Sequence, residues 1–144
     1  ANNAEGLQIV DVADPSAPAL LGSVDTTGTA YGVAVAAPLA YVADGTSGMH
    51  VIDISDSGAP ALLGTVVLTD EAYDVAVLDD VAFVAEHLGG LQVIEVTDPT
   101  APESLGAVET PDRAWSVAAP ASRSWTCPAA APARPISTAT AWSR

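Results

Sequence analysis

Short hydrophobic stretches, mostly of Ala, Val, Leu and Ile, fill most of this chain, and Gly, Pro, Asp and Ser separate them. From residue 30 onward the pattern predicts four strands, at residues 31–36, 39–43, 49–54 and 61–68. Turn residues lie between them, at Pro38, at Asp44-Gly45 and at residues 56–60. No apolar stripe at the i, i+3, i+4 spacing of a helix persists. The sequence therefore predicts an all-β protein, and Gly64 inside the fourth strand is expected to mark a bulge or a close approach.

The pattern recurs every 42 residues, since residues 48–56 have counterparts at residues 6–14 and 90–98. A glycine, a strand carboxylate and a proline mark each copy as structural repeat positions: Gly6, Gly48 and Gly90, then Asp11, Asp53 and Glu95, then Pro18, Pro60 and Pro102. Four strands in a period of about 40–45 residues are typical of a propeller blade. We predict a partial β-propeller of about three four-stranded antiparallel blades.

The phase of the repeat divides residues 1–118 of this propeller fragment. A part-blade (1–25) comes first, two blades follow (30–67 and 72–109), and the start of a further blade comes last (114–118). Closed propellers have about four to eight blades. We therefore expect an incomplete ring with exposed sheet edges, which favour self-association or pairing with further blades of the same protein.

Residues 119–144 depart from the repeat and are predicted to form an irregular tail rich in Ala, Pro and Arg. They hold three of the four arginines and none of the 18 acidic residues. When residues 121–128 are back-translated and read one base out of frame, the degenerate codons can encode the core stretch of the repeat. The tail is thus either a frameshifted repeat or an unrelated sequence whose degenerate codons permit the match by chance.

The net charge of −14 argues against nucleic acid and anionic membranes as partners, because both require Lys and Arg. It can attract cations or basic partners, but we favour a solvated acidic surface over a specific acidic site. No apolar run approaches the roughly 18 residues of a membrane span, and no signal peptide is visible. Cys127 is the single cysteine, so no intrachain disulfide is expected.

The repeated carboxylates have two interpretations. A ring formed by Asp11, Asp53 and Glu95 can bind a cation such as Ca²⁺, but we favour hydrogen bonds within each blade, because every blade must pack. Residues 53–58 match only part of a calcium loop. Asx turns account for the carboxylates that precede the turns: Asp14, Asp56 and Asp98. We expect no cofactor.

The two histidines have different settings. His50 lies on a strand and is expected at the surface or half-buried, whereas His87 breaks the repeat in a loop beside Glu86. An acid–base pair there is the alternative to a solvent-exposed loop. No Ser-His-Asp or Cys-His set is readable, so we assign no catalytic residues. The first strand of each blade lines the central channel of a propeller. In these strands only Asp74 departs from the repeated sequence, which argues against a propeller-type hydrolase or lyase with a site in the channel.

The least repetitive residues lie in the loops between blades and between the second and third strands. In a propeller these loops share one face, and loops on a rigid scaffold often carry binding. We expect any ligand at this face, bound by residues from these loops: Asp44, Asp70, Glu71, Glu86, His87, Asp112 and Arg113.

The stretch Val51-Ile52-Asp53-Ile54, followed by Ser55-Asp56, resembles the LVIVD-repeat family. The copies depart from the family pattern at Glu95 and Ser57. The resemblance implies a β-propeller from a bacterial or archaeal protein that is surface-associated or secreted, and it implies little about activity. We therefore expect a non-enzymatic interaction or structural module that binds a protein or glycan. The alternatives are a fragment of a propeller-type enzyme and a cation-stabilised scaffold.

Overall fold

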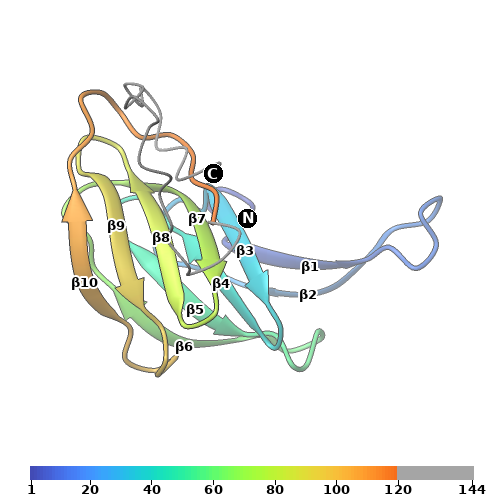
Figure 1. Cartoon of the computed structure of the whole chain (residues 1–144). Coiled ribbons are helices and arrows are strands. Elements are labelled where there is room, and N and C mark those ends of the chain that lie inside the picture. The colour runs from blue at the N-terminus through green and yellow to red at the C-terminus, as the bar shows by residue number, and fades with distance from the viewer. Residues whose placement is uncertain (120–144) are drawn as a thin grey trace, which may run out of the picture.

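A computed structural model describes residues 1–119 and contains ten strands in this part of the chain. Figure 1 shows them as a hairpin beside two larger sheets. The strands are β1 (Leu7–Asp11), β2 (Ala19–Val24), β3 (Gly32–Ala36), β4 (Leu39–Ala43), β5 (Met49–Asp53), β6 (Ala61–Val66), β7 (Ala72–Leu78), β8 (Val81–Glu86), β9 (Gly90–Glu95) and β10 (Glu103–Val108). Residues 1–119 include no helix that is long and apolar enough to cross a membrane.

Strands that follow one another in the sequence pair antiparallel, so each sheet is a simple meander. β1 and β2 form a two-stranded sheet, β3 to β6 form a four-stranded sheet, and β7 to β10 form another. The all-β partial propeller predicted from the period is therefore confirmed. β4 coincides with the strand predicted at residues 39–43, whereas β6 ends at Val66, two residues before the predicted end.

The turns that lead into the outermost strands are Asx turns, as predicted. Asp14 accepts hydrogen bonds from both the backbone N–H and the hydroxyl of Ser16, and Asp98 accepts the same pair from Thr100. The carboxylate of Asp56 accepts the backbone N–H of Gly58. These bonds hold the chain reversal without help from another element.

Gly64 has both roles predicted for it. The register between β5 and β6 shifts between Val51 and Ile52, next to Gly64, which is a β-bulge. A Cβ at Gly64 would lie 2.5 Å from the carbonyl oxygen of Pro99, so the next sheet approaches the bare backbone here. Gly48, by contrast, has a positive φ of 85°, which L residues rarely adopt.

The hydrophobic core lies between successive sheets. Leu7 of the first sheet packs with Val42 and Ile52 of the second. Met49 and Val51, on the other face of the second sheet, pack with residues of the third: Ala72, Val75, Ala82, Val84, Ile94 and Val96. Each sheet thus buries one face against its predecessor and the other against its successor, as successive blades do.

Residues 114–118, predicted to begin a further blade, form no strand, yet they enter where an inner strand would run. The backbone N–H of Ala114 donates to the carbonyl of His87, as that of Ala72 does to Gly45 and that of Ala30 to Asn3. Ala114 and Val117 are buried against the third sheet. The expectations for residues 120–144 lie outside the described residues.

Candidate functional site

Three aromatic rings at the same position of the repeat form a continuous column near the inner strands. Tyr31 stacks on Tyr73 with ring centroids 4.7 Å apart, and Tyr73 meets Trp115 at 4.9 Å. The His87 ring lies 5.4 Å from both Tyr73 and Trp115. We call Tyr31, Tyr73, Trp115 and His87 the aromatic column. Its two ends are open, because Tyr31 is 47% exposed and Trp115 is 51% exposed.

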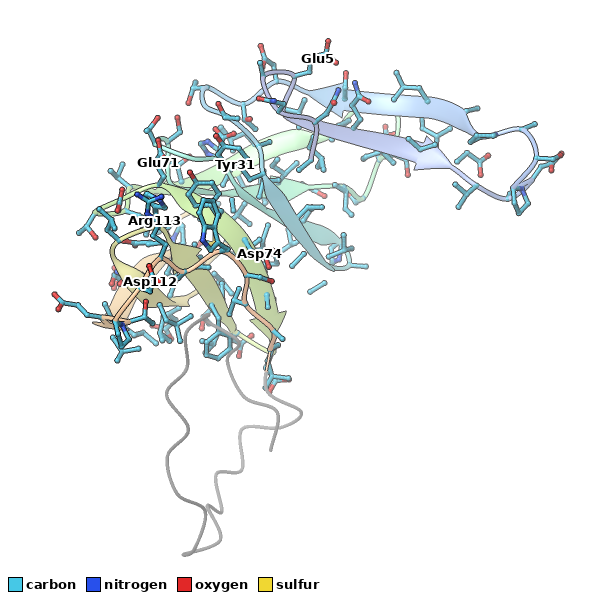
Figure 2. The ribbon with its side chains drawn as sticks, turned by 90° about the horizontal axis from the view of Figure 1, so that it is seen from above. Glu5, Tyr31, Glu71, Asp74, Asp112 and Arg113 are labelled. Atoms are coloured by element: carbon cyan, nitrogen blue, oxygen red, sulfur yellow. The ribbon has the colours of Figure 1, made fainter. Side chains whose placement is uncertain are left out.

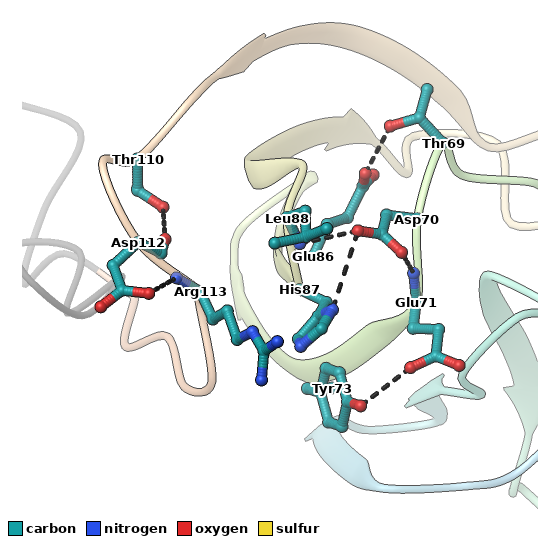
Figure 3. A network of polar contacts seen from close by, with 10 residues as sticks. All are labelled: Thr69, Asp70, Glu71, Tyr73, Glu86, His87, Leu88, Thr110, Asp112 and Arg113. Atoms are coloured by element: carbon teal, nitrogen blue, oxygen red, sulfur yellow. Dashed lines mark hydrogen bonds and ion pairs between the residues drawn. The ribbon is translucent and has the colours of Figure 1, made fainter.

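Charged groups from two loops border the aromatic column, as Figure 3 shows. The Tyr73 hydroxyl donates to a Glu71 carboxylate oxygen at 2.8 Å, and Asp70 lies 4.0 Å from the His87 ring. The Arg113 guanidinium reaches toward His87 and Tyr73. In Figure 2, Glu71, Tyr31 and Arg113 share one face of the molecule. Four of the predicted ligand-binding residues therefore meet at one feature: His87 belongs to the aromatic column, and Asp70, Glu71 and Arg113 border it.

Hydrogen bonds shift two pKa values in this border. The backbone N–H groups of Glu71 and Leu88 donate to Asp70 at 2.8 and 2.7 Å, and these bonds lower the pKa of the Asp70 carboxyl. The bond to Glu71 raises the pKa of the Tyr73 hydroxyl. Asp70 is therefore ionised at neutral pH, and backbone groups of its own loop and of the β8–β9 loop hold it in place.

The remaining predicted site residues lie apart from the aromatic column. Asp112 bonds the backbone N–H of Arg113 and stays exposed. Asp44 and Glu86 were expected at the loop surface, but both are buried, with 0% and 1% exposure. Their side chains turn inward, where three groups lie within hydrogen-bond distance of Asp44 and one hydroxyl donates to Glu86.

Asp44 is the centre of a buried polar network. Its carboxylate accepts the Thr26 hydroxyl at 2.6 Å and the Gly28 backbone N–H at 2.7 Å. Nε2 of His50 lies 2.9 Å from it, and Nδ1 of His50 lies 2.7 Å from the Thr65 hydroxyl. His50 is only 3% exposed, so the prediction of a surface or half-buried histidine was wrong.

Glu86 occupies the position of Asp44 in the next repeat but makes fewer bonds. The Thr69 hydroxyl donates to its Oε2 at 2.6 Å, while Oε1 has no hydrogen-bond partner among the described residues. In the same repeat Gln92 takes the place of His50 and donates to the hydroxyl of Ser104 at 2.6 Å. Both repeats thus tie a buried polar side chain to a hydroxyl on the outermost strand.

Asp74, the polar break in the inner strands, is fully engaged. One carboxylate oxygen accepts the backbone N–H of Val75, and the other accepts the Ser116 hydroxyl at 2.7 Å and the Val117 backbone N–H at 3.0 Å. Asp74 therefore attaches the segment that follows β10 to the innermost strand of the third sheet.

A family model described as the LVIVD repeat matches the chain three times, over residues 1–26, 27–67 and 70–110. The chain belongs to the LVIVD-repeat family. A search of curated proteins found no match. The three matched segments correspond to the three sheets, so each LVIVD repeat supplies one blade or part of one.

The acidic positions of the LVIVD repeat make local hydrogen bonds, as we favoured. Asp11 and Asp53 each accept the backbone N–H two residues further on, and Glu95 accepts the Thr97 hydroxyl. Within residues 1–119 no group of three His, Cys, Asp or Glu side chains is placed to hold a metal ion.

Sequence reasoning missed the aromatic column, although its signal was present. Tyr31, Tyr73 and Trp115 occupy one position of the LVIVD repeat, at the entry to each inner strand. A large aromatic side chain at a fixed repeat position reads as core, and only the packing of successive blades shows that these rings meet one another at an open surface.

Proposed function

We propose that the chain is a non-enzymatic binding module whose loop face holds a partner protein or glycan, within a prokaryotic protein that is exposed at the cell surface or secreted. The aromatic column carries this proposal. It presents Tyr31 and Trp115 to solvent, and the carboxylates of Glu71 and Asp70 lie beside the Tyr73 and His87 rings of the same column. Aromatic side chains supply contact area at low entropic cost and are enriched where proteins bind. The cellular location rests on the family resemblance.

Of the two ligand classes we favour a protein segment that carries Lys or Arg. A cation over the face of Tyr or Trp is attracted by the ring, at about 0.5–2 kcal/mol depending on desolvation. The carboxylate of Glu71 adds a partner for the same cation. The net charge of −14 draws basic segments to the molecule. Arg113, whose guanidinium already reaches the aromatic column, is an example within the chain.

Binding is favoured over catalysis by the way the polar side chains are used. The carboxylate of Asp74 already accepts hydrogen bonds from the backbone and from the Ser116 hydroxyl. The hydrogen-bonded side chains of Asp44, His50 and Thr65 are the chemical groups of a hydrolytic triad. In the next repeat Gln92 stands at the position of His50, but Ala107 stands at the position of Thr65, so that repeat lacks these groups. Both ring nitrogens of the buried His50 are within hydrogen-bond distance of Asp44 and Thr65, which supports a structural role.

An array of Lys- and Arg-containing peptides and of glycans tests the proposal. We expect the chain to bind a subset of the basic peptides, and the double variant Tyr31→Ala/Trp115→Ala to bind them at least tenfold more weakly, which is about 1.4 kcal/mol. Leu62→Ala, which removes an apolar side chain that is 48% exposed on β6, is the matched control and should bind normally. Binding of glycans alone would show that the ligand is a glycan and not a basic peptide. Peptide binding that survives in the double variant would show that the aromatic column is not the binding site.

A further inference from the structure

The contact between successive sheets is built around a glycine of the outermost strand. Gly22 of β2 is covered by the backbone of Ser57 and Gly58, which belong to the last turn of the second sheet. Gly64 of β6 is covered in the same way by Pro99 and Thr100, from the last turn of the third sheet. Neither glycine has room for a Cβ, so each turn lies directly on the preceding blade.

The third glycine of this set is uncovered. A Cβ at Gly106 of β10 would meet no atom within 4 Å. Its neighbours Leu105 and Val108 are 59% and 54% exposed. The same face leaves Phe83 only half-buried, whereas its counterpart Tyr41 in the second sheet is 3% exposed. The third sheet thus exposes, near β10, the same kind of surface on which the following blade packs in the first two sheets.

The first sheet carries the turn that would fit there. In each repeat the turn that covers a glycine follows the third strand, and its first copy is residues 14–17. Ser16 donates its N–H and hydroxyl to Asp14 at 3.0 and 2.6 Å, and Thr100 donates its own to Asp98 at 2.9 and 2.7 Å. The turn at residues 14–17 is therefore already formed, and all of it is exposed.

The sheet face behind this turn is also uncovered. Val10 of β1 is 47% exposed, whereas its counterparts Ile52 and Ile94 have 0% exposure because each is packed within the sheet-to-sheet core. Val35 of β3 is 64% exposed at a position where Val77 packs against the second sheet. The beginning of the described blades thus lacks a predecessor, just as their end lacks a successor.

We propose that two copies of the chain associate head to tail, the first sheet of one copy packing on the third sheet of the other. The turn at residues 14–17 then covers Gly106 as the equivalent turns cover Gly22 and Gly64. This interface has the same form as the two contacts between successive sheets within one chain. Residues 114–117 are held at the inner strand of the third sheet by hydrogen bonds to Asp74. In the pair they lie beside the first sheet of the other copy and cover Val35 of that copy.

The number of blades supports a closed pair. Each copy provides three repeats, which is fewer than the about four to eight blades of a closed propeller. Two copies provide six, and two identical head-to-tail contacts then close a ring with twofold symmetry.

Sedimentation equilibrium of the 144-residue chain between about 1 and 100 μM, the range in which weak interfaces become populated, tests the proposal. We expect twice the mass of one chain. Gly106→Ala should weaken association at least tenfold and leave the circular dichroism and the cooperative melt unchanged, because its Cβ is free of contacts within one chain. The control, Ala107→Leu, changes the neighbouring residue, whose side chain points to the opposite face of β10, and should still dimerise.

Mixing two defective chains tests the head-to-tail arrangement. Val10→Asp damages the head and Gly106→Ala damages the tail, so each variant alone should be monomeric. Their mixture should recover a dimer through the one junction that is intact on both sides. A wild-type monomer at all concentrations overturns the proposal. Masses that grow without limit overturn the closed pair, and a mixture that stays monomeric overturns the head-to-tail contact.

Discussion

Asp44 and Glu86 show how one methylene group changes a buried carboxylate. Both stand at the end of the second strand of a blade, and both are buried. Asp44 receives donors from Thr26, Gly28 and His50, whereas Glu86 receives the hydroxyl of Thr69 and leaves one oxygen without a partner in the described part of the chain. Asp44 is thus the stronger anchor between its blade and the loop of residues 25–29.

Replacing Asp44 by Ala should lower the free energy of unfolding by about 3 kcal/mol, because the buried Thr26 and His50 and the partly buried Gly28 lose their hydrogen-bond partner. Urea denaturation measures this. Asp11→Ala is the matched control. It removes an exposed carboxylate with one local bond to the backbone of Ala13, and its cost should stay below about 1 kcal/mol. Equal losses in both variants would show that the buried network does not anchor the loop.

Acid should destabilise the loop face through Asp70. Two backbone N–H groups lower the folded-state pKa of this carboxyl below its unfolded value. Its stabilisation is therefore complete above the unfolded pKa of about 3.9 and is lost as the pH falls through the folded pKa. We expect the urea midpoint of Asp70→Asn to fall less steeply than that of the wild type below about pH 4. Glu103→Gln, an exposed site on β10, should follow the wild type. Parallel curves for wild type and Asp70→Asn would contradict this role.

At the scale of the element, the last strand of each blade carries a bulge beside a bare glycine. The register shifts next to Gly22, Gly64 and Gly106 alike, so the bulge belongs to the repeat itself. The glycine is required only where another blade lies on it, which is the case for Gly22 and Gly64.

Gly64→Ala should therefore destabilise the chain, since the added Cβ meets the backbone of Pro99 and Thr100. We expect a loss of about 1–3 kcal/mol, the usual cost of forcing extra atoms into a packed contact. Gly106→Ala, measured by urea denaturation at a concentration where the chain is monomeric, should cost nothing or add up to about 1 kcal/mol by restricting the unfolded chain. A harmless Gly64→Ala would mean that the third sheet does not press on β6.

Strands and turns were predictable because their causes are local. A short apolar run ended by Asp44-Gly45 placed β4, and an Asp followed by Pro or Ser placed the Asx turns. The burial of His50 and the meeting of Tyr31 with Tyr73 were not, because both depend on contacts between segments that no local pattern describes. For the same reason the sequence located the loop face but did not separate the exposed Asp70 from the buried Asp44.

At the scale of the whole molecule, charge opposes the proposed pairing of two chains. Each copy carries a net charge of −14, so bringing two together costs electrostatic energy that salt screens. Sedimentation equilibrium should show the dimerisation constant strengthening several-fold between about 0.05 and 0.5 M NaCl, as the Debye length shortens from about 14 to about 4 Å. Weakening with salt would indicate an association held by ion pairs and would contradict a contact made of Gly106, Leu105 and Val10.

The central claim is that LVIVD blades act as a scaffold that presents the aromatic column to a partner. Amide chemical shifts of the ¹⁵N-labelled chain, followed while a basic peptide selected on the array is added, test it most directly. The account predicts the largest shifts at residues of the column and its border: Tyr31, Glu71, Tyr73, His87, Arg113 and Trp115. Shifts confined to β1, β2 and β10, with this set unmoved, would contradict it.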